Sequence, residues 1–250
     1  MGYRIGFDIG STTIKAVVLD ENNQICYKSY ERHKAQVRQK ALDKLVELKK
    51  YTKEPFKFAI SGSGALGLCE QGELPFVQEV FASATGVSKL YPETDCAIEL
   101  GGEDAKILFF QGSVEQRMNS TCAGGTGAFI DQMSTLLNMS LEEMNEASLN
   151  YHRLYPIASR CGVFAKTDIQ PLINQGVDKC DLCASIFQAV VDQTITSLAQ
   201  GRKIEGNILF LGGPLYFMSG LRKRFVETLK LSDVQVNCPE TAINFVALGT

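Results

Sequence analysis

The chain has 250 residues, and its 25 Lys and Arg against 28 Asp and Glu give a formal net charge of −3. A mildly acidic chain without a basic block has little attraction for nucleic-acid phosphate, so nucleic acid is excluded as a partner. With 45% hydrophobic and 21% charged residues, the composition is typical of a folded globular protein. We identify no apolar run near the ~18 residues of a membrane helix and no secretory signal, which predicts a cytoplasmic protein that makes no membrane contact. The eight cysteines are then expected to be thiols or metal ligands.

The first sixty residues predict an α/β unit of order β-β-β-α-β. Three β-rich segments, separated by tight polar turns, come first: 3–8, 13–20 and 25–31. Apolar residues recur at helical spacing over 33–51, which indicates an amphipathic helix. A further strand over 56–61 ends at a Gly-Ser-Gly turn.

An internal repeat appears when the chain is shifted by 91 residues, because Asp8 then falls on Glu99 and Lys15 falls on Lys106. Both copies read strand, acid, apolar residue, glycine turn and returning strand. Later, Asn-Ile-Leu-Phe-Leu-Gly-Gly-Pro mirrors the strand that ends at Gly-Ser-Gly. Such duplication predicts two similar lobes that face each other across a cleft. We expect lobe I to cover 1–92, completed by 241–250, and lobe II to cover 93–240.

Helices are expected in the second half of the chain, with starts near Cys122, Ser140, Cys161 and Asp181. The helix after Ser140 has a capping box with Glu143, and the helix from Asp181 meets a good C-terminal residue in Gly201. The segment 241–250 reads as a short helix without a C-cap, which is marginal. This suggests a piece of a longer protein, with a frayed natural terminus as the alternative.

The first glycine turn has the features of a phosphate-binding hairpin. Asp8 ends a strand, Gly10, Ser11 and Thr12 form the turn, and Lys15 lies on the returning strand. Turn amides can donate to phosphate oxygens, and Lys15 adds a positive charge. For one copy alone, an ordinary β-hairpin is an equally good interpretation.

The second copy changes that balance. Glu99, Gly101 and Gly102 repeat the pattern, and two such hairpins can clamp a polyphosphate from both sides. Asp8 and Glu99 are hard oxygen ligands suited to hold Mg²⁺ through water.

A third element places Gly212, Gly213 and Pro214 at the end of a strand, where a flat ring can lie against bare backbone. By itself this pattern is also common in plain turns. The chain has no GxxxxGK[ST] segment and no GxGxxG after its first strand, which disfavours Walker-type and Rossmann sites.

Together the three turns resemble the ATPase superfamily of actin, sugar kinases and heat-shock chaperones, over the whole chain. The resemblance implies an α/β, actin-like (ribonuclease H-like) ATPase fold, with two similar lobes around a cleft for ATP or ADP. The segments 119–133 and 159–176 further resemble the activator ATPases of 2-hydroxyacyl-CoA dehydratases and the ATPase subunits of benzoyl-CoA reductase. This likeness implies that Gly124, Gly125 and Thr126 belong to the cofactor site.

In that family two cysteines per subunit, matched here by Cys122 and Cys161, bind one 4Fe-4S cluster shared across a homodimer. The resemblance implies ATP-driven transfer of a low-potential electron, with Mg²⁺ and the cluster as cofactors. It also implies a 2-hydroxyacyl-CoA dehydratase-type acceptor, a donor such as ferredoxin or flavodoxin, and a homodimer or tandem-domain pseudo-dimer.

The residues themselves agree with a shared cluster. Cys122 and Cys161 each precede a predicted helix, whose N-terminus favours a thiolate. Two thiols per chain cannot complete a Cys₄ shell, so a second subunit must supply the rest. Two small buried residues at helix starts are the alternative.

Hydrolysis is expected to depend on positioning and metal charge, with Glu103 or Asp104 orienting the attacking water. Here the sequence departs from the family, which more often has Asp at the position of Glu99 and Gln at that of Glu103. The two histidines, His33 and His152, are predicted to be solvated surface residues.

The remaining cysteines are expected to be structural. Cys26 and Cys96 lie in predicted strands and should fill core space. Cys180 and Cys183 form a lone CxxC without the second pair of a zinc site, so we interpret them as core and surface positions of one helix.

Two other functions stay open at this point. One is a small-molecule kinase of the same superfamily, with a catalytic Asp. The other is a nucleotide-gated binding or filament-forming module without redox function.

Overall fold

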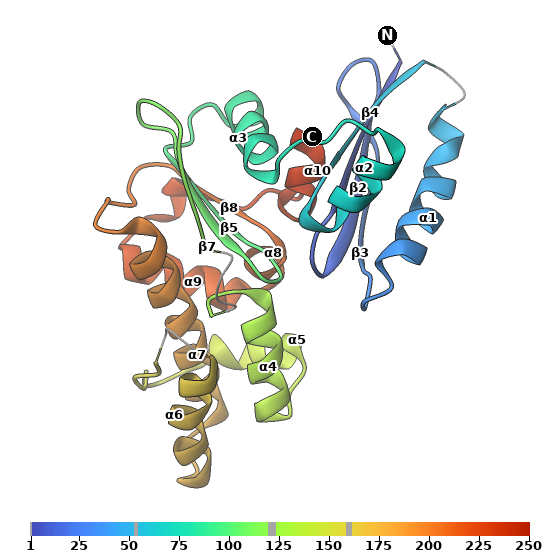
Figure 1. The fold of residues 1–250 in the computed structure, drawn as a ribbon. Helices are drawn as coiled ribbons and strands as arrows, with labels where there is room; N and C mark the ends of the chain where they lie inside the picture. Colours follow the sequence, from blue (N-terminus) through green and yellow to red (C-terminus); the bar gives the residue numbers. More distant parts are fainter. Residues whose placement is uncertain (1, 53–54, 120–123, 159–161) are drawn as a thin grey trace. The chain divides into compact units, whose positions relative to one another are not determined.

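The computed structural model describes residues 2–52, 55–119, 124–158 and 162–250. The chain divides into two compact units, of which unit 1 comprises Met1–Pro92 and Thr241–Thr250 and unit 2 comprises Glu93–Glu240. Each unit has its own β-sheet and its own hydrophobic core (Figure 1).

Unit 1 is built on a four-stranded sheet of order β3-β2-β1-β4. Its strands are β1 Tyr3–Ile9, β2 Thr13–Leu19, β3 Ile25–Arg32 and β4 Phe56–Ser61. The first three are antiparallel neighbours, whereas β4 is parallel to β1. A parallel pair needs a crossover connection, and α1, Val37–Leu48, provides it. The predicted β-β-β-α-β order is therefore confirmed.

The described residues of unit 1 form three further α-helices: α2 Leu66–Gly72, α3 Glu79–Leu90 and α10 Phe245–Gly249. The last is only five residues long, yet Phe245, Val246 and Ala247 are all buried. The Phe245 ring lies 6.1 Å from the Tyr91 ring, centroid to centroid. Burial of these side chains stabilises a helix that its length alone would leave marginal.

Unit 2 is built on a five-stranded sheet of order β7-β6-β5-β8-β9. Its strands are β5 Cys96–Leu100, β6 Ala105–Phe109, β7 Glu115–Asn119, β8 Ile208–Leu211 and β9 Val236–Asn237. The strands β5, β6 and β7 are antiparallel neighbours, and β8 is parallel to β5. This repeats the arrangement of unit 1, with β9 added at the edge.

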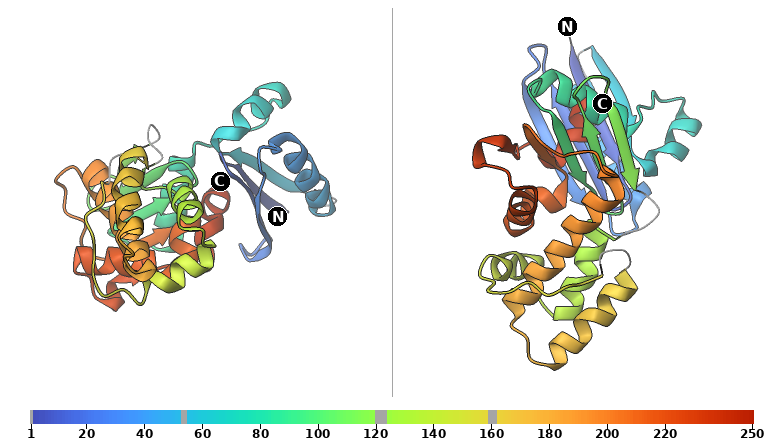
Figure 2. Two further views of the ribbon diagram at one scale, coloured as in Figure 1. Left: turned by 90° about the horizontal axis from the view of Figure 1, so that it is seen from below. Right: turned by 90° about the vertical axis from the view of Figure 1, so that its left-hand side faces the viewer.

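Among the described residues between β7 and β8 of unit 2 there are four α-helices, and Figure 2 shows them grouped beyond one end of the sheet. They are α4 Gly127–Leu137, α5 Leu141–Ser148, α6 Gly162–Asn174 and α7 Lys179–Thr194. The capping box of α5 is confirmed, because Ser140 Oγ accepts from the Glu143 amide at 3.1 Å and the Ser140 amide donates to Glu143 Oε2 at 2.7 Å. Two short helices follow β8: α8 Gly213–Phe217 and α9 Ser219–Leu229.

Two predicted helix starts are shifted. The helix placed near Cys122 begins at Gly127. The helix placed at Asp181 begins at Lys179, because Asp178 Oδ1 accepts from the Cys180 amide at 2.7 Å and caps it.

The prediction that no segment suits a membrane needs correction. Among the described residues one helical stretch, Lys179–Ala199, has the length and hydropathy of a membrane span. However, 72% of its most apolar window is buried inside the structure, and Leu182, Ile186, Phe187 and Val190 belong to the core of unit 2. A long apolar helix is also what the core of a folded protein contains.

Candidate functional site

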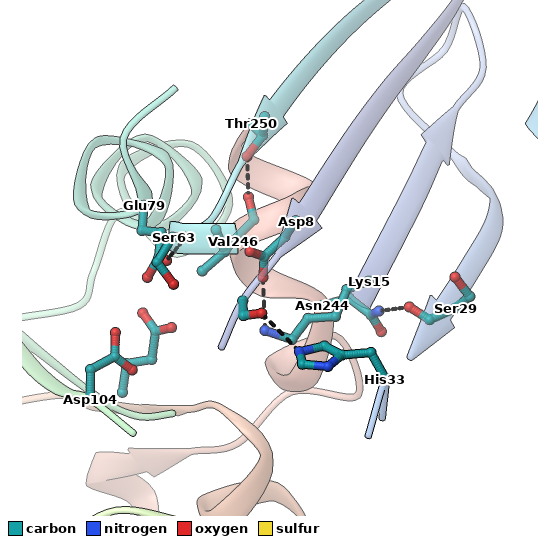
Figure 3. A network of polar contacts seen from close by, with 12 residues as sticks. Asp8, Lys15, Ser29, His33, Ser63, Glu79, Asp104, Asn244, Val246 and Thr250 are labelled. Carbon is teal, nitrogen blue, oxygen red and sulfur yellow. Dashed lines mark hydrogen bonds and ion pairs between the residues drawn. The ribbon is translucent and has the colours of Figure 1, made fainter. Parts of the chain in front are cut away.

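The predicted phosphate turn of unit 1 has an acid-lysine pair at its base. The Gly10 amide closes the turn by donating to the Thr13 carbonyl at 2.9 Å. Asp8 and Lys15 face each other across β1 and β2, and Lys15 Nζ donates to Asp8 Oδ2 at 2.7 Å (Figure 3). Asp8 is 1% exposed, and its Oδ1 has no hydrogen-bond partner among the described residues. One buried carboxylate oxygen is therefore available to a cation or to water.

The end of β4 lies against this carboxylate. Ser61 is the register partner of Asp8, and its buried Oγ likewise has no hydrogen-bond partner in the described part of the chain. Gly62 has φ of +98°, and a Cβ there would lie 2.2 Å from the Ile9 carbonyl oxygen and 2.6 Å from Asp8 Oδ1. Only glycine fits this approach. Ser61 and Gly62 are not among the predicted site residues, although the glycine turn after β8, which mirrors the turn after β4, was an available signal for them.

Unit 2 repeats the hairpin with its facing acid and lysine. The Gly101 amide donates to the Asp104 carbonyl at 2.8 Å, and Glu99 faces Lys106 across β5 and β6. Lys106 Nζ lies 3.5 Å from Glu99 Oε1 and 3.2 Å from Asp104 Oδ2. Lys106 is 2% exposed, so its charge is balanced by both carboxylates. Of the two residues predicted to orient water, Asp104 thus pairs with Lys106, whereas Glu103 is exposed.

The start of α4 is joined to the second turn. The Gly127 amide donates to the Gly101 carbonyl at 3.0 Å, and the Ala128 amide donates to the Gly102 carbonyl at 2.7 Å. A Cβ on Gly127 would lie 3.3 Å from Pro214 Cγ. The turn, the start of α4 and the start of α8 therefore converge at one place in unit 2.

The other predicted cofactor residues of unit 2 lie at this convergence. Gly124, Gly125 and Thr126 are all buried and directly precede α4. Gly212 has φ of +87°, and a Cβ there would lie 2.0 Å from the Leu100 carbonyl oxygen. It leads into Gly213 and Pro214 at the first turn of α8.

At the tip of the first turn, Ser11 is exposed, and Gly10 and Thr12 are half-buried. The prediction that His33 is solvated is wrong, because its ring covers this turn and the residue is 4% exposed. His33 directly follows β3, and its backbone amide donates to the Thr12 carbonyl at 3.1 Å. A polar residue is usually expected at the surface, so the sequence did not indicate that His33 is buried against the turn. His152 is exposed, as predicted.

Cys122 and Cys161, the predicted cluster ligands, lie outside the described residues, and α6 begins at Gly162. In the described part of the chain, no three His, Cys, Asp or Glu side chains are placed to hold a metal ion together.

The structural cysteines divide by burial. Cys96 is buried in β5 as predicted, and desolvation raises its pKa to about 12. Cys26 is exposed, so its predicted core position is wrong; it lies on β3, an edge strand on which both Ile25 and Cys26 are exposed. In the CxxC, Cys183 is buried with its pKa raised to about 12 by desolvation, whereas Cys180 is half-buried.

A family model and individual relatives both match most of the length of this chain. The model of the BadF/BadG/BcrA/BcrD ATPase family matches residues 5–248. The (R)-2-hydroxyglutaryl-CoA dehydratase activating ATPase of Acidaminococcus fermentans is 26% identical over 215 residues, which cover 84% of this chain and 82% of the relative. The activator of lactoyl-CoA dehydratase of Anaerotignum propionicum is 29% identical over 217 residues, with coverages of 84% and 83%.

Solved structures agree with these relatives. The crystal structure of the Acidaminococcus fermentans (R)-2-hydroxyglutaryl-CoA dehydratase component A superposes with a TM-score of 0.87 at 26% identity, covering 100% of this chain and 96% of that one. The activator of the 2-hydroxyisocaproyl-CoA dehydratase from Clostridium difficile with bound ADPNP gives 0.85 at 26% identity, with coverages of 99% and 92%. A ROK family glucokinase from Streptomyces griseus gives 0.54 at 15% identity, with coverages of 99% and 96%, which shows the fold alone. The predicted actin-like ATPase fold is confirmed.

Proposed function

The chain belongs to the BadF/BadG/BcrA/BcrD ATPase family, and on this premise we propose that it is an ATP-dependent activator, a one-electron donor to an enzyme of the 2-hydroxyacyl-CoA dehydratase type. The names of the relatives support the acceptor, since they are activators of hydroxyglutaryl-CoA and lactoyl-CoA dehydratases. In this proposal ATP hydrolysis drives a low-potential electron toward the acceptor. The protein acts in the cytoplasm and takes electrons from a donor such as ferredoxin or flavodoxin.

The proposal of nucleotide binding depends on one observation: the glycine turn occurs twice, each time with a buried acid, Asp8 or Glu99, at its base. Asp8 and Glu99 are the proposed acidic groups for a hydrated Mg²⁺ ion, which would neutralise phosphate charge. The buried Oδ1 of Asp8 fits this role, because it has no hydrogen-bond partner among the described residues. Lys15 and Lys106 each balance the neighbouring carboxylate within the same hairpin.

The remaining nucleotide contacts follow from the backbone. The amides around Gly10, Ser11 and Thr12 are proposed to bind phosphate oxygens, as are those of Gly101 and Gly102. The positive φ of Gly212 leaves bare backbone beside Gly213 and Pro214, which suits a flat adenine ring. Gly124, Gly125 and Thr126, beside these turns in unit 2, complete the proposed set. Glu103 is exposed, which leaves its carboxylate accessible to orient a water molecule.

Cys122 and Cys161 are the proposed ligands of a 4Fe-4S cluster shared by two subunits or by two tandem domains. The support is the match of their surrounding segments to the family and the need for four thiolates per cluster. When bound, the cluster would supply the low-potential electron. Because these residues lie outside the described part of the chain, no contact of theirs enters the proposal.

Calorimetric titration tests the nucleotide site. We expect Asp8→Ala to lose turnover of Mg-ATP while the protein keeps its fold, because the buried carboxylate at the turn is gone. Asp43→Asn is the matched control, since Asp43 is exposed on α1. Wild-type affinity for Mg-ATP and Mg-ADP in the Asp8 variant would refute the assignment.

Anaerobic reconstitution with iron and sulfide tests the cluster. We expect about four irons per dimer, and loss of both iron and dimer in Cys122→Ser and Cys161→Ser. Cys26→Ser and Cys180→Ser, which change thiols in the described residues, should keep the iron. Electron transfer to a dehydratase-type acceptor should require ATP. Full iron content in both ligand variants would refute the electron-donor function, and phosphorylation of a sugar by iron-free protein would favour the kinase alternative.

A further inference from the structure

His33 makes two contacts with the first phosphate turn. Its backbone amide donates to the Thr12 carbonyl at 3.1 Å, and its ring Nε2 lies 3.2 Å from the Gly10 carbonyl oxygen (Figure 3). A carbonyl oxygen only accepts hydrogen bonds, so Nε2 must carry the proton and donate. The ring Nδ1 is buried and has no hydrogen-bond partner within the described residues. The side-chain hydrogen bond of the ring is therefore the one that Nε2 donates to the turn.

Three carbonyls of the turn receive a hydrogen bond in this way. The Gly10 carbonyl receives the His33 ring, the Thr12 carbonyl receives the His33 amide, and the Thr13 carbonyl receives the Gly10 amide. In a trans peptide the carbonyl and the following N–H point in opposite directions. Holding the Gly10 carbonyl therefore turns the Ser11 N–H away from His33, at the exposed tip of the turn. A turn preset in this way needs no reorganisation to receive an anion.

Unit 2 holds the equivalent carbonyl by different means. Gly101 occupies the position of Gly10 in the repeat, and its carbonyl receives the amide of Gly127 at 3.0 Å. The next carbonyl, that of Gly102, receives the amide of Ala128. The first turn of a helix thus does in unit 2 what the histidine does in unit 1. Because the same carbonyl is held in both copies, its restraint is a shared requirement of the turn.

We propose that His33 is a positioning residue of the nucleotide site, whose ring and backbone amide hold the turn Gly10–Thr13 in the conformation that receives a nucleotide phosphate. This inference rests on the proposed nucleotide binding. Its effect is confined to the phosphates, because His33 contacts the turn of unit 1 and the proposed adenine contacts belong to other residues.

Two substitutions distinguish the effect of the hydrogen-bond donor of the His33 ring from the effect of the volume of its side chain. His33→Leu fills similar space without a donor, whereas His33→Gln carries an amide nitrogen at nearly the reach of Nε2. We expect ADP affinity to fall roughly tenfold in His33→Leu, the size of one lost hydrogen bond, and adenosine affinity to be unchanged. His33→Gln should restore most of the ADP affinity. His152→Leu, at an exposed position, is the matched control.

Calorimetry with ADP and adenosine gives clear outcomes. Wild-type ADP affinity in His33→Leu would overturn the proposal, and so would an equal loss for adenosine, since that indicates general loosening. If His33→Leu does not fold, His33→Gln and His33→Asn decide, because the Asn amide is one bond shorter. Equal ADP affinities in these two variants would then overturn it.

Hydrogen exchange in the ligand-free protein separates this inference from the proposed function. The amides of Gly10 and of residue 33 should exchange roughly tenfold faster in His33→Leu. Each donates a hydrogen bond to a carbonyl of the turn, Thr13 or Thr12, that the ring holds in place. The Gly101 amide, in the turn held by α4, should keep its rate. Unchanged exchange at Gly10 would overturn the role of His33. If the wild-type protein binds neither ATP nor ADP, the proposed function fails, and the exchange rates still decide the role of His33.

Discussion

The two units hold the same turn with different groups. In unit 1 a histidine side chain binds the Gly10 carbonyl, whereas in unit 2 the backbone amide of Gly127 binds the Gly101 carbonyl. The hydrogen bond inside each turn is the same, at 2.9 Å in unit 1 and 2.8 Å in unit 2. A main-chain contact persists through most substitutions, while a side-chain contact is lost with one residue. The repeat therefore conserves the turn geometry, and the supporting residues differ.

The glycines that end β4 and β8 test how far the repeat extends. Gly62→Ala and Gly212→Ala should each lower the free energy of unfolding by about 3 kcal/mol or more, the largest effects we expect. Both have positive φ, and a Cβ would lie 2.2 Å from the Ile9 carbonyl oxygen or 2.0 Å from that of Leu100. Urea denaturation measures both.

Gly67→Ala is the control for these glycines, because a Cβ there meets nothing within 4 Å and the residue lies in α2. It should change the free energy of unfolding by less than about 1 kcal/mol, in the stabilising direction. A large effect at Gly62 with none at Gly212 would show that the two strand ends are not equivalent.

The lysines of the two turns, half-buried Lys15 and buried Lys106, are expected to differ in their contribution to stability. Lys106→Met should cost about 3 kcal/mol of unfolding free energy, because it removes the cation that Glu99 and Asp104 both face. Lys15→Met should cost about 2 kcal/mol, since Lys15 is more exposed, at 17% of its side chain against 3%. Adding Glu99→Gln to Lys106→Met should recover part of the loss. No recovery in thermal unfolding would show that packing, rather than charge, explains the cost.

The helices α4 to α7 of unit 2 replace the single helix α1 that connects β3 to β4 in unit 1. Asp181 on α7 fixes the loop before α6, since its Oδ1 accepts the amides of Arg153 at 2.9 Å and His152 at 2.7 Å. The Arg153 amide foremost, and then that of His152, lower the pKa of Asp181 below its ordinary 3.8. At pH 7, Asp181→Asn should cost about 1.5 kcal/mol, as for hydrogen bonds to a charged group.

The pH dependence of this difference follows from the sign of the shift. A depressed pKa in the folded state stabilises the protein fully above the unfolded value, and the gain is lost as pH falls through the folded value. The wild type should therefore lose its advantage over Asp181→Asn as the pH falls below about 4, measured by urea unfolding at several pH values. A constant difference from pH 7 to 3 would contradict the role of the charge.

Gly127→Ala should have the smallest effect. A Cβ there would lie 3.2 Å from the Gly101 carbonyl oxygen and 3.3 Å from Pro214 Cγ, so neighbours need to shift by only a few tenths of an ångström. The gain in helix propensity offsets this, and we expect a change below about 1 kcal/mol in unfolding free energy. The backbone amide of residue 127 remains, so ADP affinity should stay near that of the wild type. If Gly127→Ala lost as much ADP affinity as His33→Leu, the main-chain contact that holds the turn in unit 2 would be no more tolerant of substitution than the side-chain contact in unit 1.

The sequence by itself determined the features that depend on neighbours along the chain. A β-rich segment, a glycine turn and an apolar run were enough to predict β1 and β2, and their register follows from the turn between them. The pairing of Asp8 with Lys15, seven residues apart, is a consequence of that register, and the repeat carries it to Glu99 and Lys106.

Only the tertiary structure decided the contacts between distant segments. His33 and Cys26 were misplaced because polarity and strand propensity do not tell which side of an edge strand is covered. The contact between Gly101 and Gly127 joins a turn to a helix start, and that between Leu100 and Gly212 joins strands more than a hundred residues apart. Such contacts form only when separate elements pack together. The residue pattern of one segment does not indicate which distant segment will pack against it.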